Sequence, residues 1–143
     1  SFLEFDFIFY EHLEPKLILE YNRMQAFIKE DGHALTDSPW PLNAGILLEK
    51  GNVVIAGTFF NLIKYENTIL LNLTYVDILH RRMGIYKQLN RFIDLIGVEK
   101  NKSNLYSYIH IENSTMVNYV MPSIGYTPVM TLVRRKINDN INP

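Results

Sequence analysis

The stretch VDILHRRMGIYK, residues Val76–Lys87, decides the fold of this chain. It follows an apolar β-type run and precedes an amphipathic helical run, so it predicts a strand end, a basic loop and a helix start. Helix N-termini present unpaired N–H groups and a positive dipole end, and a glycine such as Gly84 lets an anion approach the backbone. Arg81 and Arg82 add positive charge. The loop therefore predicts a pyrophosphate-sized anion site, with ordinary helix capping as the alternative.

Upstream of this loop, period-two patterns and turn residues predict an antiparallel meander. Its three strands are Ala44–Glu49, Val53–Lys64 and Thr68–Asp77, with turns at Lys50–Asn52 and Tyr65–Asn67. Downstream of the loop, apolar residues recur at helical spacing and predict a second helix packed on the sheet. The residues on its apolar face are Ile85, Leu89, Phe92, Ile93 and Ile96.

The ends of the chain contribute further elements. The N-terminal run Phe2–Phe9 predicts a first strand, and a first helix follows Glu14-Pro15 and stops at Asp31-Gly32. The Pro-rich run Ala34–Pro41 predicts a loop anchored by Trp40.

Beyond the second helix, the pattern predicts a polar turn at Asn101–Asn104 and then alternates again. Leu105–Ile111 is a β-rich run, Ser114–Met121 a short helix, and Tyr126–Ile137 a last strand. The tail Asn138–Pro143 is expected to fray.

This element order predicts one α+β domain over residues 1–137. We expect a mixed, mostly antiparallel central sheet flanked by helices, with parallel pairing between the two strands that flank the second helix. No internal repeat competes with this interpretation.

Composition narrows the function classes. The 143 residues, 48% hydrophobic, suit one buried core, and the net charge of -1 disfavours a dedicated nucleic-acid binder. The absence of cysteine excludes disulfides and thiol nucleophiles, and no metal site is expected. Apolar stretches are far below the roughly 20 residues of a membrane span, and the start does not resemble a leader, which predicts a cytoplasmic protein.

The run Arg81-Arg82-Met83-Gly84-Ile85-Tyr86 resembles the [QR]-x-x-G-x-[GA] signature of the GNAT superfamily of N-acetyltransferases. Val76 lies five residues before the first arginine, as the family's strand valine does. The resemblance implies acetyl-CoA as cosubstrate, with loop amides on the pyrophosphate and the preceding strand along the pantetheine arm. The residues that it assigns to the cosubstrate are Tyr75, Val76, Asp77, Arg81, Arg82, Met83, Gly84, Ile85, Tyr86 and Lys87. Tyr86 departs from the family's small residue, which is compatible with the signature if its side chain points away from the phosphates.

A second block, from Ile111-Glu112-Asn113 to Ile124-Gly125-Tyr126, looks like the family's strand, asparagine, helix and Gly-Phe/Tyr segment. By resemblance Asn113 faces the coenzyme, and helix N-capping is the alternative. The spacing from Asn113 to Gly125 is about one residue longer than the common form, and Pro122 ends or kinks the helix.

Acetyl transfer to an amine needs a held thioester, an oxyanion donor, a base for the amine proton and an acid for the leaving thiolate. The resemblance implies a backbone N–H near Tyr75 or Val76 as donor, where GNAT strands bulge and splay. Asp77, His80, His110 and Glu112 are the base candidates, because each lies near an end of the two strands flanking the thioester; solvation, a structural histidine or a water chain are the alternatives. His110 is the catalytic candidate among them.

The family's tyrosine acid falls at position 121, which is Met here. Tyr119 is the substitute candidate, with aromatic packing as its alternative. Trp40, Glu11, His12 and Glu14 could border the acceptor pocket, and the acceptor itself stays open.

The sequence thus predicts an acetyl-CoA-dependent N-acetyltransferase that transfers directly to an amine in a ternary complex, since no cysteine can carry an acyl intermediate. A catalytically weak or inactive module that binds acyl-CoA or a protein partner is the alternative. A nucleic-acid modifier is disfavoured by charge. No membrane partner is expected, and a homodimer is plausible.

Overall fold

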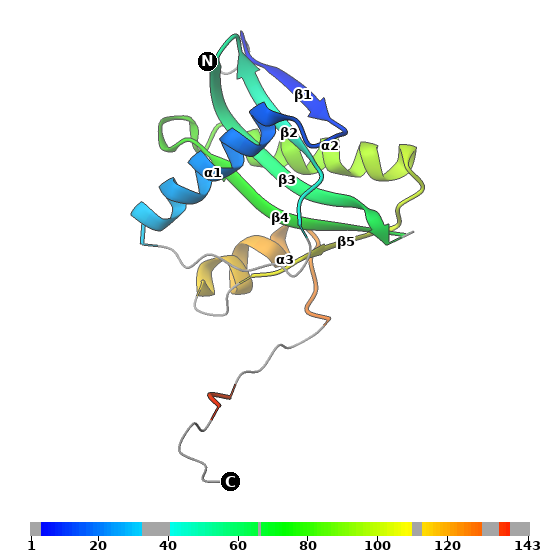
Figure 1. Ribbon diagram of the computed structural model, residues 1–143. Helices are drawn as coiled ribbons and strands as arrows, with labels where there is room; N and C mark the ends of the chain where they lie inside the picture. The colour runs from blue at the N-terminus through cyan, green and yellow to red at the C-terminus, as the bar shows by residue number, and fades with distance from the viewer. Residues whose placement is uncertain (1–3, 33–40, 66, 110–112, 130–134, 138–143) are drawn as a thin grey trace, which may run out of the picture.

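A computed structural model describes residues 4–32, 41–65, 67–109, 113–129 and 135–137 of the chain. Its centre is one five-stranded sheet in the order β1-β2-β3-β4-β5 (Figure 1). The strands are β1 Asp6–Tyr10, β2 Ala44–Lys50, β3 Val53–Tyr65, β4 Thr68–Val76 and β5 Asn104–Ser107. The first four strands pair antiparallel, and β5 joins β4 in parallel.

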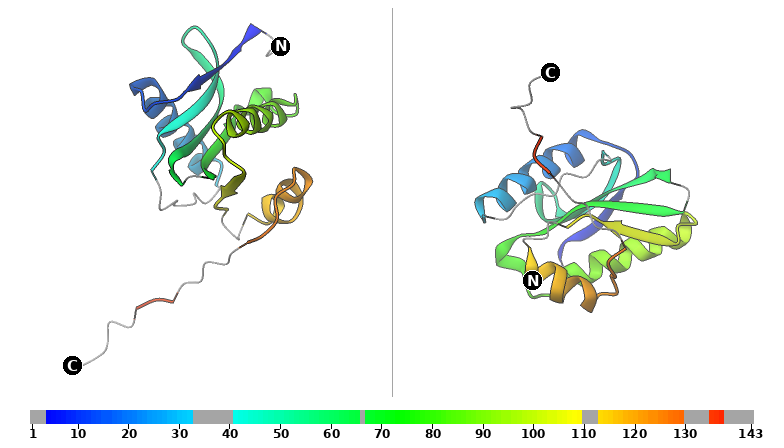
Figure 2. Two further views of the ribbon diagram at one scale, coloured as in Figure 1. Left: turned by 90° about the vertical axis from the view of Figure 1, so that its right-hand side faces the viewer. Right: turned by 90° about the horizontal axis from the view of Figure 1, so that it is seen from below.

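Helices cover both faces of the sheet (Figure 2). The helix α1 lies on one face, and α2 lies on the other with the C-terminal helical segment beside it. These elements are α1 Pro15–Glu30, the 3-10 turn η2 Ile78–His80, α2 Ile85–Glu99, the π-helical turn η3 Met116–Val120 and α3 Met121–Ser123. The single sheet with helices on two sides is the α+β architecture that the sequence predicts.

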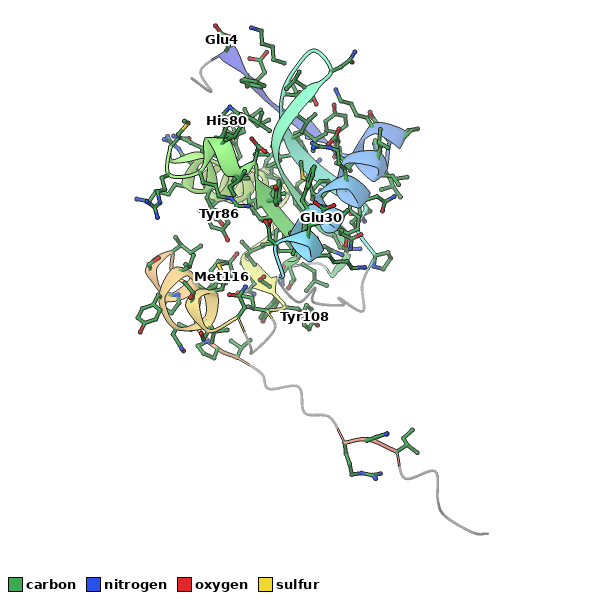
Figure 3. The ribbon with its side chains drawn as sticks, turned by 90° about the vertical axis from the view of Figure 1, so that its left-hand side faces the viewer. Glu4, Glu30, His80, Tyr86, Tyr108 and Met116 are labelled. Carbon is green, nitrogen blue, oxygen red and sulfur yellow. The ribbon has the colours of Figure 1, made fainter. Side chains whose placement is uncertain are left out.

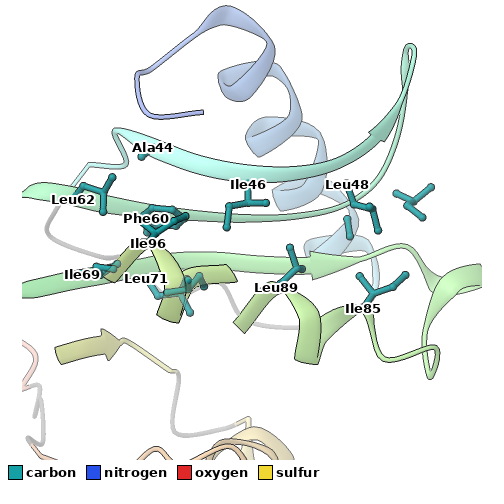
Figure 4. Close-up of a cluster of buried hydrophobic side chains, with 13 residues drawn as sticks. Ala44, Ile46, Leu48, Phe60, Leu62, Ile69, Leu71, Ile85, Leu89 and Ile96 are labelled. Atoms are coloured by element: carbon teal, nitrogen blue, oxygen red, sulfur yellow. The ribbon is translucent and has the colours of Figure 1, made fainter. Parts of the chain in front are cut away.

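Two apolar layers hold the helices to the sheet. Under α2, Ile85, Leu89 and Ile93 are buried against Ile46 and Phe60 (Figure 4). They lie on one face of α2 because they recur at helical spacing. On the opposite face, a second buried cluster joins α1 to the sheet; its residues are Tyr10, Leu17, Met24, Leu47, Val54, Phe59 and Tyr75.

The meander, both long helices and the parallel β4–β5 pair confirm the predicted architecture. The first strand is shorter than predicted, because β1 begins at Asp6, opposite Glu49. Glu4 precedes the ladder and forms an ion pair with Lys50 at 2.8 Å. The predicted strand Leu105–Ile111 ends at Ser107, and its residues 110–111 lie outside the described ranges.

The prediction of a last strand over Tyr126–Ile137 is wrong for its described parts. Residues 126–129 and 135–137 are not strand, and residues 130–134 lie outside the described ranges. A strand requires a hydrogen-bonded neighbour. In Figures 1 and 2 the described parts of this segment lead away from the sheet, so no strand lies beside them to pair with.

The alternating pattern that favours a strand is therefore not enough without a partner. The predicted loop Ala34–Pro41, with Trp40, lies almost wholly outside the described residues, as do Glu66 and the tail after Ile137.

Gly97, within α2, gives a direct test of helix packing. A Cβ there would lie 3.6 Å from the Lys102 carbonyl oxygen and 3.8 Å from Ile69 Cδ1, which are ordinary contacts. Because glycine costs a helix about 0.5–1 kcal/mol relative to alanine, we expect Gly97→Ala to raise the thermal midpoint by a few degrees.

The matched substitution is Gly45→Ala, whose Cβ would lie 2.9 Å from the Thr58 carbonyl oxygen and 2.7 Å from Leu17 Cδ1. It should lower the midpoint measured in the same calorimetric scan. A fall in Gly97→Ala as well would mean that the α2–β4 interface is tighter than these distances indicate.

Candidate active site

An opening between β4 and β5 forms the centre of the candidate site. The two strands pair only through Thr68–Leu71 and Asn104–Ser107, yet β4 continues to Val76. Over this continuation, the side of β4 that faces away from β3 has no strand partner among the described residues. Backbone groups of β4 are therefore free to bind an extended ligand in the way that a neighbouring strand would.

A bulge and the ladder alternation decide which groups these are. The register shifts so that Phe59 opposes Leu73 and Phe60 opposes Leu71, which leaves Asn72 as the extra residue. Further along, the Asp77 N–H donates to the Ile55 carbonyl at 2.7 Å.

Antiparallel ladders alternate between hydrogen-bonded and non-hydrogen-bonded pairs. Tyr75 opposite Gly57 is therefore a hydrogen-bonded pair, whereas the N–H and C=O of Val76 point away from β3 toward the opening. The bulge thus lies at Asn72, earlier than the sequence analysis places it. Of the two backbone donors expected there, the register favours Val76 over Tyr75.

The loop after β4 opens onto a cleft of about 510 Å³ between the start of α2 and the C-terminal helical segment. The residues that line the cleft are Val76, His80, Arg81, Arg82, Gly84, Ile85, Tyr86, Lys87, Val120, Ser123 and Ile124. Eight of these eleven come from the stretch 76–87, so the cleft lies where the sequence predicts an anion site, with the C-terminal helical segment on its other side.

Gly84 caps α2 in the left-handed conformation, with a φ of 82°. A Cβ at this position would meet no heavy atom within 4 Å, so the space in front of the helix end is open. Arg82 is also left-handed, at φ 65°, which is strained for a residue other than glycine and is typical of functional sites. The first N–H groups of α2 have no partner within the helix, and they face this open space with the positive dipole end.

Arg81 is already engaged with the protein. Its Nε donates to the Val76 carbonyl at 2.9 Å, its guanidinium lies 3.5 Å from the Asp31 carboxylate, and it stacks over the Tyr75 ring at 5.5 Å. Arg81 therefore fixes the loop to the end of β4 and to the end of α1. Arg82 and Lys87 are exposed, and within the described residues they form no ion pair, so they are the cations available to an anionic ligand.

Two of the predicted base candidates lie together. At the η2 turn, His80 Nδ1 and Asp77 Oδ2 are 2.9 Å apart, and the backbone N–H of His80 donates to the backbone carbonyl of Asp77. This contact fixes the imidazole orientation and leaves Nε2 as the second nitrogen of a cleft-lining ring. His110 and Glu112 lie outside the described residues.

Tyr86 crosses from α2 to the C-terminal helical segment, as Figure 3 shows. Its hydroxyl lies 3.9 Å from Sδ of Met121, whose side chain is buried. Burial raises the pKa of Tyr86, so its phenol keeps its proton at neutral pH. Tyr86 is also one of the residues that line the cleft.

Tyr126 lies beside this contact. Its hydroxyl is buried and has no hydrogen-bond partner among the described residues. Burial is the main cause that raises the pKa of Tyr126, and the neighbouring Tyr86 and Asp94 add to it.

The other two residues singled out on the C-terminal segment do not enter the cleft. Asn113 Oδ1 accepts the Met116 N–H at 3.4 Å, which is the helix-capping alternative for this residue. Tyr119 is 72% exposed and does not line the cleft. The segment passes through the π-helical turn Met116–Val120, a rare form often found at functional sites, and this turn changes which side chains face α2.

Sequence reasoning missed Val120, Ser123 and Ile124 as cleft residues, together with the Tyr86–Met121 contact. The only signal in the sequence was the departure of Tyr86 from the expected small residue. Two functional features are absent from the described residues: no group of three or more His, Cys, Asp or Glu side chains could hold a metal ion, and no helix has the length and apolar character needed to cross a membrane.

Comparison with solved structures finds whole-chain matches. The aminoglycoside N-acetyltransferase AAC(6')-Iy in complex with CoA matches with TM-score 0.63 and 15% identity over 93% of this chain and 99% of that chain. The ribosomal-protein-alanine N-acetyltransferase from Brucella melitensis biovar Abortus 2308 matches with TM-score 0.67 and 13% identity over 93% and 99%. No protein-family model and no curated sequence matches the chain.

An aminoglycoside acetyltransferase from an uncultured soil metagenomic sample, in complex with sisomicin, matches with TM-score 0.67 and 12% identity over 94% of this chain and 95% of that chain. Because the identities are only 12–15%, these comparisons establish the fold alone. The parallel β4–β5 pair, the helices on both faces of the sheet and the matches over 93–94% of the chain agree: the chain has the α+β fold of the GNAT acetyltransferases.

Proposed function

We propose that this protein is an N-acetyltransferase that uses acetyl-CoA as cosubstrate and transfers the acetyl group directly to an amine in a ternary complex. The observation that carries the proposal is the opening between β4 and β5, which ends at the Gly84 loop and the positive end of α2. This is one continuous path, with a neutral backbone edge for an amide-containing arm and an anion cradle for phosphates.

The residues present fit that cosubstrate. The open space at Gly84 and the first amides of α2 would hold the pyrophosphate, with Arg82 and Lys87 as supporting cations. The unpaired edge of β4 would run alongside the pantetheine arm. Acetyl-CoA supplies a thioester, which is an activated acyl group. The neighbouring structure of AAC(6')-Iy contains CoA on the same fold, which supports this assignment.

Two groups of the chain itself could serve acetyl transfer, one as the oxyanion donor and one as the base for the amine proton. The Val76 N–H points into the opening and is the donor that we assign to the oxyanion, where charge develops on the acyl oxygen. The amine proton must leave for the new C–N bond to persist, and the departing sulfur must gain a proton. His80, oriented by Asp77, is the described side chain in the cleft that can accept the first proton, and a water chain is the alternative.

Release of free thiol distinguishes enzyme from binding module. We expect the protein to release CoA from acetyl-CoA only when an amine is present, and the panel should include an aminoglycoside, a peptide N-terminus and a polyamine. His80→Gln should lower kcat about tenfold or more without changing the KM for acetyl-CoA if His80 is the base. An unchanged kcat would assign the proton to a water chain.

The second candidate function is a non-catalytic module that binds acyl-CoA. It is favoured by Met121, which stands at the position of the family's tyrosine acid, and by the exposure of Tyr119 outside the cleft. Such a module would be stabilised by acetyl-CoA and would release no thiol with any amine. Absence of both stabilisation and thiol release would contradict the two functions together.

A further inference from the structure

The Tyr86 hydroxyl donates to a poor hydrogen-bond acceptor. A thioether sulfur is a weak acceptor, and the Tyr86 hydroxyl reaches Met121 Sδ only at 3.9 Å. The residue is nevertheless half-buried in the wall of the cleft. A buried hydroxyl without a good acceptor costs free energy, so this arrangement is expected to improve when an oxygen acceptor enters the cleft.

The position of Tyr86 on α2 indicates where that oxygen would lie. Tyr86 is the second residue of the helix, directly after the Gly84 cap and Ile85. Side chains in a helix tilt toward its N-terminus, so the phenol is carried toward the end where the unpaired amides and the dipole attract an anion. Tyr86 and the start of α2 thus line the same cleft.

The neighbouring Tyr126 phenol also indicates that a ligand oxygen would be favourable in this interface. The Tyr126 hydroxyl is buried next to Tyr86 and has no partner among the described residues. The interface between α2 and the C-terminal segment therefore contains two phenol hydroxyls, and within the described residues the hydrogen-bond acceptor found for them is the Met121 thioether. Such an interface satisfies its donors better with a ligand oxygen present.

We propose that Tyr86 is a ligand-binding residue of the cleft, and that its hydroxyl leaves the Met121 sulfur to donate a hydrogen bond to a diphosphate oxygen of bound coenzyme A. This rests on the proposed function, because it requires that coenzyme A binds the cleft. The large residue at position 86 then adds a contact that a glycine or alanine there could not make.

The test removes the hydroxyl alone. A hydrogen bond to a charged group is worth enough that Tyr86→Phe should weaken coenzyme A binding about tenfold or more in isothermal titration calorimetry. The loss should be of similar size for adenosine 3′-phosphate 5′-diphosphate, which keeps the diphosphate and lacks the pantetheine arm. Met121→Leu, which removes the sulfur and keeps an apolar side chain, should bind coenzyme A as tightly as the parent or slightly better.

Tyr10→Phe is the matched control, because it also removes only a phenol hydroxyl, here one that donates to Glu49 Oε2 at 2.8 Å, in the cluster on the opposite face of the sheet. It should leave coenzyme A affinity unchanged. Equal affinity of Tyr86→Phe and the parent would overturn the inference, and tighter binding by Tyr86→Ala would show that the side chain obstructs the cleft. A loss restricted to coenzyme A would assign the hydroxyl to the pantetheine arm and reject the diphosphate. If the parent binds neither ligand, the proposed function itself fails.

Discussion

Replacing Gly84 by leucine is expected to abolish the thermal stabilisation that acetyl-CoA gives to the protein. Ligand that binds only the native state stabilises it by about 2.7 kcal/mol at a concentration of 100 Kd, which for a chain of this size raises the thermal midpoint by about 5–10 °C. The leucine side chain would fill the open space in front of α2, where the pyrophosphate is proposed to lie. We therefore expect the midpoint of Gly84→Leu to be the same with and without saturating acetyl-CoA.

Backbone strain must be separated from this effect, because Gly84 has a φ of 82° and any other residue is strained there. Gly51 is the matched control: its φ is 58°, a Cβ there also meets open space, and it does not line the cleft. Gly51→Leu should lose a similar amount of intrinsic stability and keep the full response to acetyl-CoA. A ligand response that survives in Gly84→Leu would remove the cleft from consideration as the cosubstrate site.

The sequence predicts those parts of the fold that depend on local pattern. The meander of β2, β3 and β4 follows from alternation and from turn residues such as Gly51, and α2 follows from the apolar face that includes Leu89. The backbone of the proposed anion cradle belongs to this group, because strand end, glycine and helix start are consecutive in the chain. For the same reason the fold class of the whole domain could be predicted from the sequence.

The features that could not be predicted from the sequence depend on contacts between residues far apart in the chain. The bulge at Asn72 arises from the register between β3 and β4, and a change of one residue in that register exchanges Tyr75 and Val76 as donors to the opening. Tyr86 meets Met121 across 35 positions, through a π-helical turn that has no simple sequence signature. The alternating segment Tyr126–Ile137 failed as a strand in its described parts because alternation says nothing about an available partner.

The second large effect is expected on stability, where α2 packs against the sheet. Leu89 is completely buried between α2 and the sheet, in the cluster that contains Ile46 and Phe60. Truncation of a buried leucine to alanine removes its transfer free energy and leaves a cavity, at a cost of about 2–5 kcal/mol. We expect Leu89→Ala to lower the thermal midpoint by about 10 °C and to lower the urea midpoint without changing the slope.

Leu95→Ala is the matched control, because it is the same substitution on the same helix at a residue that is 55% exposed. Leu95→Ala should lower the midpoint by a degree or two, because most of its surface stays in water. The pair also separates stability from function: below its unfolding transition, Leu89→Ala should still bind acetyl-CoA, because the proposed cradle consists of backbone groups at the start of α2 and Leu89 does not line the cleft. If its affinity fell while the helix remained folded by circular dichroism, the position of α2 on the sheet, and not the cradle alone, would set the geometry of the anion site.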